Sequence, residues 1–373
     1  MYFDYNATTP LLPEVVEAML PFLRDEFGNP SSSHPLGRRA REAVERARAQ
    51  VAALIRAEPS EIVFTSGGTE ANNLALFGTL ADSKRRSLVT SAIEHPAIAE
   101  VCTALARGGV SVTRLPVDGE CRVRLEPART ALVADVALLS VMHSNNETGT
   151  LQPVAELAQL ARAAGARVHT DAAQSAGKVP LDVNALGVDL LSLAGHKLYA
   201  PKGVGALYVR RGVPLRPFMR GAGQEHGVRP GTENVASIVG FGVACDRAAN
   251  ELESLASRLR ALTGALWRRL EGAVAGLKRN GHPELCLPNT LSVRFPRATG
   301  SAVLARCGVA ASTGSACHAD VETASGVLLA MGVDAAEALG TVRLSVGRGT
   351  TEEQVERAAA ELASAWRTVS SGR

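Results

Sequence analysis

The sequence lacks the patterns that would place it in several large classes of protein. It has no uninterrupted apolar run near the roughly 20 residues that a membrane-spanning helix needs. Its N-terminus does not pair a basic segment with an apolar one, so no export signal is predicted. The six cysteines contain no Cys-x-x-Cys pair, which argues against a zinc site or a disulfide framework. With a formal net charge of only +3, direct binding of nucleic acid is not expected either. These absences favour a cytoplasmic protein without a metal centre or a membrane anchor.

A glycine loop follows the first strand-like run, but it lacks the fingerprints of a nucleotide-binding loop. Residues 61–65 are largely β-branched or aromatic, residues 66–70 read Ser-Gly-Gly-Thr-Glu, and residues 71–80 have a helical pattern. The loop has neither Gly-x-Gly-x-x-Gly nor a Walker-type lysine. Amides at a helix N-terminus nevertheless bind phosphate, and glycines let the backbone approach it. Gly68 and Thr69 are therefore candidate phosphate-binding residues.

Two further strand-like runs end in polar residues. Residues 166–171 end in Asp171, with Gln174 one turn later, and an apolar strand around residues 188–191 leads to Lys197. If these strands are parallel, their carboxyl ends bring the glycine loop, Asp171 and Lys197 to one crevice. Desolvation lowers the pKa of a lysine and makes its amine a nucleophile toward aldehydes. The ordinary alternative is a lysine that reaches water from the end of a strand.

A phosphate grip, a carboxylate and a desolvated lysine together match the requirements of pyridoxal phosphate. This cofactor bonds to a lysine, anchors its phosphate on a helix, and withdraws electrons while a carboxylate keeps its ring nitrogen protonated. His95 is a candidate to lie flat on the ring, unless it is only a capping or turn residue before Pro96. Asn146 is a candidate partner of the ring oxygen or the substrate, and otherwise a turn asparagine.

Cys317 and Arg343 suggest the rest of the chemistry. Cys317 lies among small residues that cannot bury it, so its thiol is expected to be accessible, as reactive cysteines are. It could also be an unremarkable loop thiol. Arg343 lies on a strand-like run, where its guanidinium could clamp a carboxylate with two hydrogen bonds. The alternative is an exposed strand arginine.

Eight ordered motifs, spread nearly from end to end, resemble the cysteine desulfurases of the class V aminotransferase group. The segment after Cys317 resembles the branch of that family with a long, mobile cysteine loop. The motifs occupy residues 5–10 (YNATTP), 27–32 (FGNPSS), 65–70 (TSGGTE), 145–149 (NNETG), 171–175 (DAAQS), 195–197 (GHK), 229–232 (RPGT) and 312–317 (STGSAC).

The resemblance implies a type I pyridoxal-phosphate-dependent transferase fold and a role for each candidate. Lys197 would hold the cofactor aldehyde, His95 would stack on the ring, and Asp171 would pair with the ring nitrogen. Cys317 would accept the sulfur. The remaining roles would fall to Gln174 and Asn146 near the ring oxygen and the substrate, to Arg343 on the substrate carboxylate, and to Gly68, Thr69, His196 and, from the partner subunit of a homodimer, Thr232 on the phosphate.

The implied reaction is the removal of sulfur from L-cysteine. Lys197 would move the α-proton, Cys317 would attack the substrate sulfur and become a persulfide, and L-alanine would leave. The persulfide would then pass to an iron–sulfur scaffold or another acceptor protein docked near Cys317. A selenocysteine lyase or another cysteine C–S lyase is the main alternative, because a β-substituted amino acid needs the same electron sink. A sulfur carrier or scaffold that has lost turnover is a further one.

Two positions depart from the family pattern. Many relatives have serine where Ala194 stands, so one hydroxyl contact to the phosphate is missing and weaker cofactor binding is expected. Gly326 replaces a histidine or tyrosine that relatives often carry after the cysteine loop, which bears on how that loop docks.

The order of elements predicts an α/β fold with two domains. Strands and helices alternate from about residue 60 to 245, which indicates a large, doubly wound, mostly parallel sheet, and we assign residues 13–251 to this cofactor-binding domain. Residues 252–373, together with residues 1–12, are expected to form a smaller α+β domain that carries the cysteine loop. Its predicted elements are a long amphipathic helix from residue 252, strands at 291–295 and 342–346, and a terminal helix capped by Thr351.

Overall fold

The structure is a computed structural model that describes residues 1–313, 316–318 and 321–371. Its centre is a seven-stranded sheet in the order β1-β7-β6-β5-β4-β2-β3. The pairs from β6 to β3 are parallel, and β7 runs antiparallel to both of its neighbours. This confirms the predicted mostly parallel sheet. The strands are β1 (Ile62–Thr65), β2 (Ser87–Ser91), β3 (Ser111–Leu115), β4 (Val136–Ser140), β5 (Arg167–Asp171), β6 (Leu190–Ala194) and β7 (Gly205–Val209).

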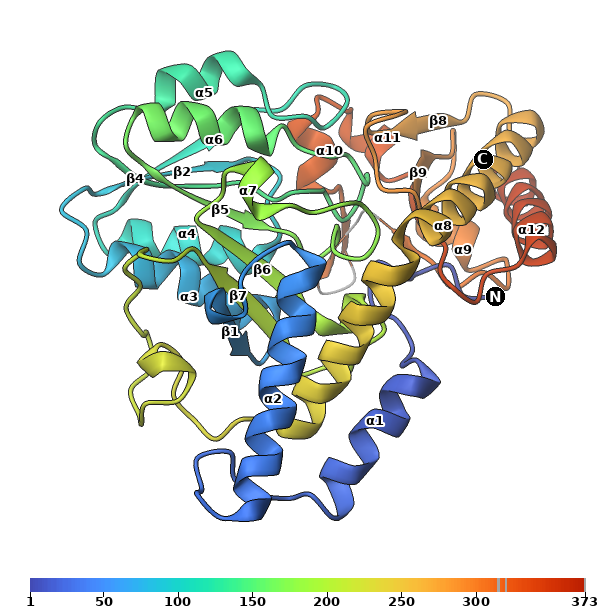
Figure 1. Cartoon of the computed structure of the whole chain (residues 1–373). Coiled ribbons are helices and arrows are strands. Elements are labelled where there is room, and N and C mark those ends of the chain that lie inside the picture. Colours follow the sequence, from blue (N-terminus) through green and yellow to red (C-terminus); the bar gives the residue numbers. More distant parts are fainter. Residues whose placement is uncertain (314–315, 319–320, 372–373) are drawn as a thin grey trace.

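Helices cover both faces of this sheet (Figure 1). Adjacent residues of a strand point to opposite faces, so Leu190 and Leu191 of β6 enter two different hydrophobic clusters. Two helices close one face, α3 (Gly68–Leu80) and α4 (Pro96–Arg107). The other face carries α1 (Pro13–Arg24), α2 (Pro35–Leu54), α5 (Leu125–Ala131), α6 (Val154–Ala163), α7 (Val183–Leu186) and the first part of α8 (Val235–Ala273).

A second, antiparallel sheet forms the core of a smaller domain. Its order is β10-β13-β9-β8, and the first residues of the chain join it through the bridges Tyr2–Ala310 and Asp4–Ser345. A separate hydrophobic cluster fills this domain, with Phe3 fully buried in it. Its elements are β8 (Lys278–Asn280), β9 (Thr290–Arg294), α9 (Gly300–Leu304), β10 (Ser312–Thr313), β13 (Thr341–Ser345) and α12 (Glu352–Ser371). Two short helices between them, α10 (Gly326–Ala330) and α11 (Ala335–Ala338), pack their buried residues into the cluster of the large domain instead.

Helix α8 connects the two parts of the molecule without a break (Figure 1). Its first half packs Phe241 and Cys245 into a cluster of the large domain, and its second half packs Leu262 and Leu266 into the small domain. The helix predicted from residue 252 is therefore the second half of a longer helix. The assignment of residues 13–251 and 252–373 to separate domains stays a prediction whose boundary falls inside α8.

The terminal helix α12 begins as predicted. Thr351 Oγ1 accepts a hydrogen bond from Gln354 N at 3.2 Å, and Gln354 Oε1 accepts one from Thr351 N at 3.1 Å. This reciprocal pair is a capping box, which satisfies two backbone donors that the first turn leaves without partners.

None of the described helices is both long and apolar enough to cross a membrane.

Candidate functional site

A cavity of about 400 Å³ opens at the carboxyl edge of the large sheet, between the two domains. Strands β1, β5 and β6 run in the same direction, so the segments that follow them meet at this edge. A larger cavity of about 520 Å³ lies in the small domain and contains none of the predicted site residues. The 400 Å³ cavity is lined by Asn6, Ala7, Gly68, Thr69, Asn72, His95, Ala97, Met142, Ser144, Asn146, Asp171, Ala173, Gln174, Ala194, His196, Lys197 and Arg343.

The glycine loop forms one end of the cavity, where α3 begins. Gly67 is the N-cap of α3 and has a φ of 149°, which favours glycine. A Cβ atom built on Gly68 would lie 3.3 Å from the methyl carbon of Ala194, so these two residues stand side by side at the cavity wall. The first N–H groups of a helix have no partner within it, and they attract anions. The loop thus presents the N-terminus of a helix to the cavity, and the phosphate-binding role of Gly68 and Thr69 stays a prediction.

Ala194 has no nearby substitute for the missing hydroxyl. Ser192 lies two residues earlier on β6, but its Oγ is bonded to His169 Nε2 at 2.9 Å inside the sheet. His169 Nδ1 is in turn 2.9 Å from Ser140 Oγ. Ser192 thus belongs to a buried network that links three strands, and the cavity wall at Ala194 is left apolar.

Asp171 is held in a fixed orientation at the floor of the cavity. Its residue is only 9% exposed. Its Oδ2 accepts a hydrogen bond of 2.7 Å from Asn72 Nδ2, and its Oδ1 accepts one of 2.9 Å from Ala173 N. Asn72 Oδ1 is buried and has no hydrogen-bond partner among the described residues. A buried carboxylate beside an unsatisfied amide oxygen indicates that this floor is built to receive a polar group.

The Lys197 amine lies in the cavity at the end of the turn that follows β6. It donates hydrogen bonds to two backbone oxygens, Asn6 O at 2.5 Å and Ala7 O at 2.8 Å. Burial, together with the positive charge of Arg343, lowers the pKa of Lys197 to about 8, against the opposing effects of Asp171 and Asp4. Lys197 therefore differs from a lysine that escapes to water.

His95 is a capping residue that also lines the cavity, and its place against the cofactor ring stays a prediction. It caps α4, because its Nδ1 accepts a hydrogen bond of 3.1 Å from Ala97 N, and it also lines the cavity. Burial lowers the pKa of His95. A ring whose Nδ1 is an acceptor is neutral, and a neutral ring can lie against another aromatic ring without a charge penalty.

His196, Gln174 and Asn146 lie on the other walls of the cavity. Burial, with the charges of Lys197 and Lys202, lowers the pKa of His196 to about 4, so this ring is neutral at pH 7. Gln174 Oε1 accepts a 3.0 Å hydrogen bond from Lys178 Nζ, and Gln174 Nε2 donates one of 2.9 Å to Asn6 O. The amide of Gln174 is thus held from both ends.

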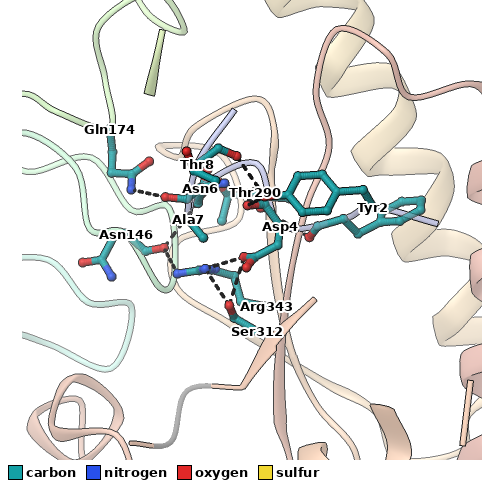
Figure 2. A network of polar contacts seen from close by, with 12 residues as sticks. Tyr2, Asp4, Asn6, Ala7, Thr8, Asn146, Gln174, Thr290, Ser312 and Arg343 are labelled. Atoms are coloured by element: carbon teal, nitrogen blue, oxygen red, sulfur yellow. Dashed lines mark hydrogen bonds and ion pairs between the residues drawn. The ribbon is translucent and has the colours of Figure 1, made fainter. Parts of the chain in front are cut away.

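Arg343 closes the cavity from the small-domain side (Figure 2). It lies on β13, its side chain is only 10% exposed, and Nη1 donates a 3.1 Å hydrogen bond to Asn146 O. Nη2 donates to Asp4 Oδ1 at 2.6 Å and to Ser312 Oγ at 2.9 Å. Arg343 is therefore not the exposed strand arginine of the alternative interpretation.

Neither Thr232 nor Cys317 belongs to the described lining of this cavity. Thr232 is exposed and lies outside its described lining. Cys317 has its backbone in β11 (Ala316–His318), which pairs with β12 (Val321–Thr323), while its side chain lies outside the described part of the structure. Gly326 is the first residue of α10, and a Cβ atom added there would meet no heavy atom of the described residues within 4 Å.

Several residues of the site were not predicted from the sequence. Asn72, Ala7, Met142 and Ser144 line the cavity, and Asp4 pairs with Arg343. Asn72 carried a usable signal, because a buried asparagine on a helix directly after a phosphate loop needs a polar partner. Asp4 carried none, since its partner is 339 positions away in the chain.

The chain was compared with known proteins. The family model described as aminotransferase class-V matches residues 1–358. The cysteine desulfurase NifS of Azotobacter vinelandii is 46% identical over 97% of this chain and 91% of its own length. The cysteine desulfurase IscS of Dictyoglomus turgidum is 44% identical over 95% of this chain and 91% of its own length.

Solved structures agree with these matches. One described as a NifS-like protein superposes with a TM-score of 0.92 at 38% identity, and 99% of each chain is covered. Another, described as SspA in complex with cysteine, has a TM-score of 0.83 at 36% identity and covers 92% of this chain and 98% of that chain.

Proposed function

This chain belongs to the class-V aminotransferase family and is a cysteine desulfurase that depends on pyridoxal phosphate, and on that premise we propose how its residues divide the reaction. The single observation that carries the proposal is the meeting of Lys197, Asp171 and the N-terminus of α3 in one cavity. The relatives are named cysteine desulfurases, which favours this activity over the selenocysteine lyase and scaffold alternatives.

The cavity fits pyridoxal phosphate. It offers unpartnered helix amides at one end, a buried carboxylate at its floor and a desolvated amine at its side. We propose that Gly68, Thr69 and His196 hold the phosphate and that Asp171 pairs with the ring nitrogen. When bound, the cofactor supplies an electron sink that stabilises negative charge on the substrate carbons. Gln174 Nε2 and Asn146 are the proposed donors near the ring oxygen and the substrate.

Lys197 is the proposed anchor of the cofactor and the base of the reaction. With a pKa of about 8, a large share of its amines is neutral near pH 8, whereas an ordinary lysine is almost entirely charged there. A neutral Nζ can bond to an aldehyde and can accept the α-proton of the substrate. His95, neutral and fixed by its cap to α4, covers one side of the reacting region.

Arg343 and Asn146 are proposed to bind the substrate carboxylate. Arg343 presents a buried Nε that has no hydrogen-bond partner among the described residues. An unsatisfied buried guanidinium N–H is costly, and a carboxylate is the ligand that satisfies it best. Asn146 lines the same cavity, and its backbone oxygen already holds Arg343.

Cys317 is the proposed sulfur acceptor. Its thiolate attacks the substrate sulfur, a sulfur–sulfur bond forms, and the bond between substrate sulfur and carbon breaks with its electron pair on the carbon. Protonation of that carbon releases L-alanine and leaves a persulfide on Cys317. We propose that the persulfide is passed, in the cytoplasm, to an iron–sulfur scaffold or another sulfur acceptor that docks near the segment carrying Cys317.

The active unit is proposed to be a homodimer in which each subunit lends Thr232 to the other's phosphate site. Thr232 is exposed and does not reach the described wall of its own cavity. Large apolar side chains are also exposed near the N-terminus, with Leu23 at 63% and Phe27 at 75%. Mixing Thr232→Ala and Lys197→Ala subunits tests this arrangement, because one mixed site regains both residues. Restored activity on mixing supports the dimer, and two inactive proteins that stay inactive contradict it.

The experiment that tests the proposed function compares cysteine variants. Cys317→Ser should lose cysteine-dependent alanine formation while its cofactor absorbance remains, because the residues proposed to hold the cofactor do not include Cys317. Cys307→Ser is the control, since Cys307 lies in the small domain beyond the lining of the cavity and should tolerate the change. Alanine formation that persists in Cys317→Ser would exclude Cys317 as the acceptor.

A further inference from the structure

Arg343 belongs to a polar array built across the small-domain sheet. Ser312 of β10 lies directly opposite Arg343 of β13 in the strand register. Asp4 bridges Ser345, two residues further along β13. Residues two apart on a strand face the same side, so the three side chains meet on one face of the sheet.

The bonds within this array are short and mutually reinforcing (Figure 2). Arg343 Nη2 donates to Asp4 Oδ1 at 2.6 Å and to Ser312 Oγ at 2.9 Å, and Ser312 Oγ donates to the same Asp4 Oδ1 at 2.9 Å. Asp4 is the carboxylate that pairs with Arg343 among the described residues. The ion pair is mostly buried, with side-chain exposures of 10% for Arg343 and 19% for Asp4.

The array leaves two of the five guanidinium N–H donors, one on Nη1 and the one on Nε, without a hydrogen-bond partner among the described residues. Both hydrogens of Nη2 are used by Asp4 and Ser312, and one hydrogen of Nη1 is used by Asn146 O. Nε has no partner within the described residues. Arg343 lines the cavity, whereas Asp4 and Ser312 are absent from its described lining. The Asp4 carboxylate therefore contacts Arg343 outside the cavity lining and does not occupy the position of a ligand.

We propose that Asp4 is a positioning residue, which fixes the Arg343 guanidinium so that it meets the substrate carboxylate in a ready-made orientation. The inference rests on the proposed role of Arg343. Arginine has a long side chain with several rotatable bonds, and the conformational entropy that this side chain loses when a ligand binds weakens the binding. A guanidinium already held by Asp4, Ser312 and Asn146 loses little further conformational entropy when the substrate binds.

Asp4 has two opposing effects on the binding of a carboxylate: it orients Arg343, and its own negative charge repels the ligand. Its Oδ1 is bonded to Nη2, and Arg343 lines the cavity whereas Asp4 is absent from the described lining, so the positive charge of Arg343 stands between Asp4 and the cavity. Removal of Asp4 would leave a buried, poorly held cation, which is free to turn toward other acceptors. We therefore expect orientation to outweigh repulsion.

The test is an equilibrium titration of the enzyme carrying its cofactor, read from the change in cofactor absorbance. L-alanine is compared with ethylamine, which is the same molecule without the carboxylate. Asp4→Ala should raise the dissociation constant of L-alanine about tenfold or more, and that of ethylamine by less than about twofold. Asp4→Asn keeps an oxygen acceptor without the charge, and should raise the constant for L-alanine about threefold.

Control variants separate the possible outcomes. Glu356→Ala removes an exposed ion pair with Arg269 in the same domain and should change neither constant. If Asp4→Ala does not fold, Asp4→Asn decides. An L-alanine constant that is unchanged or lower in the Asp4 variants, while Arg343→Gln raises it strongly, overturns the inference and leaves the proposed function standing. An unchanged constant in Arg343→Gln overturns the role of Arg343 itself, and the inference with it. Equal losses for L-alanine and ethylamine also contradict it, because they indicate a general disturbance of the site.

Discussion

Ala194→Ser is expected to improve the binding of pyridoxal phosphate. Ala194 lines the cavity beside the glycine loop, and Ser192, the nearest serine on the same strand, is engaged with His169. A serine at position 194 adds one hydroxyl to the proposed phosphate site without adding bulk elsewhere. A hydrogen bond contributes about 0.5 to 1.5 kcal/mol, which corresponds to a dissociation constant lower by about twofold to tenfold.

The assay titrates cofactor-free protein with pyridoxal phosphate and, as a matched ligand, with pyridoxal, which has no phosphate. The variant should gain affinity for pyridoxal phosphate only. Weaker or unchanged binding of pyridoxal phosphate would refute the reasoning that the wall at Ala194 faces the phosphate. An equal gain for both ligands would refute it as well, because the hydroxyl would then act on another part of the cofactor.

Two further predictions follow from the pKa values of buried lysines. Because only a neutral amine adds to an aldehyde, the rate at which cofactor-free protein captures pyridoxal phosphate should rise with pH through about 8, the pKa of Lys197. The midpoint of this rise should move to higher pH in Arg343→Gln, since the charge of Arg343 lowers the pKa of Lys197. A midpoint that does not move would contradict the assignment of this pKa to Lys197. Burial also lowers the pKa of Lys178 to about 7, so the folded protein loses this proton near pH 7, whereas the unfolded chain keeps it up to the ordinary pKa of 10.5. The cost to stability is therefore complete below pH 7 and disappears as the pH rises toward 10.5. Urea unfolding at several pH values should therefore show that the free energy of unfolding of Lys178→Met, relative to that of wild type, is higher at pH 6 than at pH 9. A difference that does not depend on pH would show that Lys178 is not desolvated as described.

The sequence was most informative where local rules determine geometry. Asp171 and Lys197 could be placed in one crevice, because parallel strands present their carboxyl ends at the same edge of a sheet. The glycines directly before a helical pattern correctly predict the loop at the start of α3. His95 was harder, because a capping residue and a ring partner give the same local pattern, and in the structure the residue caps α4 and lines the cavity as well.

The sequence did not predict side-chain pairs between segments that lie far apart in the chain. The pairs Asp4–Arg343 and Asn72–Asp171 join residues 339 and 99 positions apart, and no local periodicity records such a pairing. The helix predicted from residue 252 begins earlier, at Val235, for a related reason. Its apolar residues change partners near the middle of the helix, so the hydrophobic pattern changes while the backbone continues unbroken.

The identity of the lysine that holds the cofactor tests the central claim most directly. Borohydride reduction of the enzyme fixes the cofactor permanently to the amine that binds it, and peptide mass spectrometry then locates the label. Lys178 is a second buried lysine close to the cavity, which makes the result discriminating. The account predicts a label on Lys197 alone, and a label on Lys178, on another lysine or on none would contradict it.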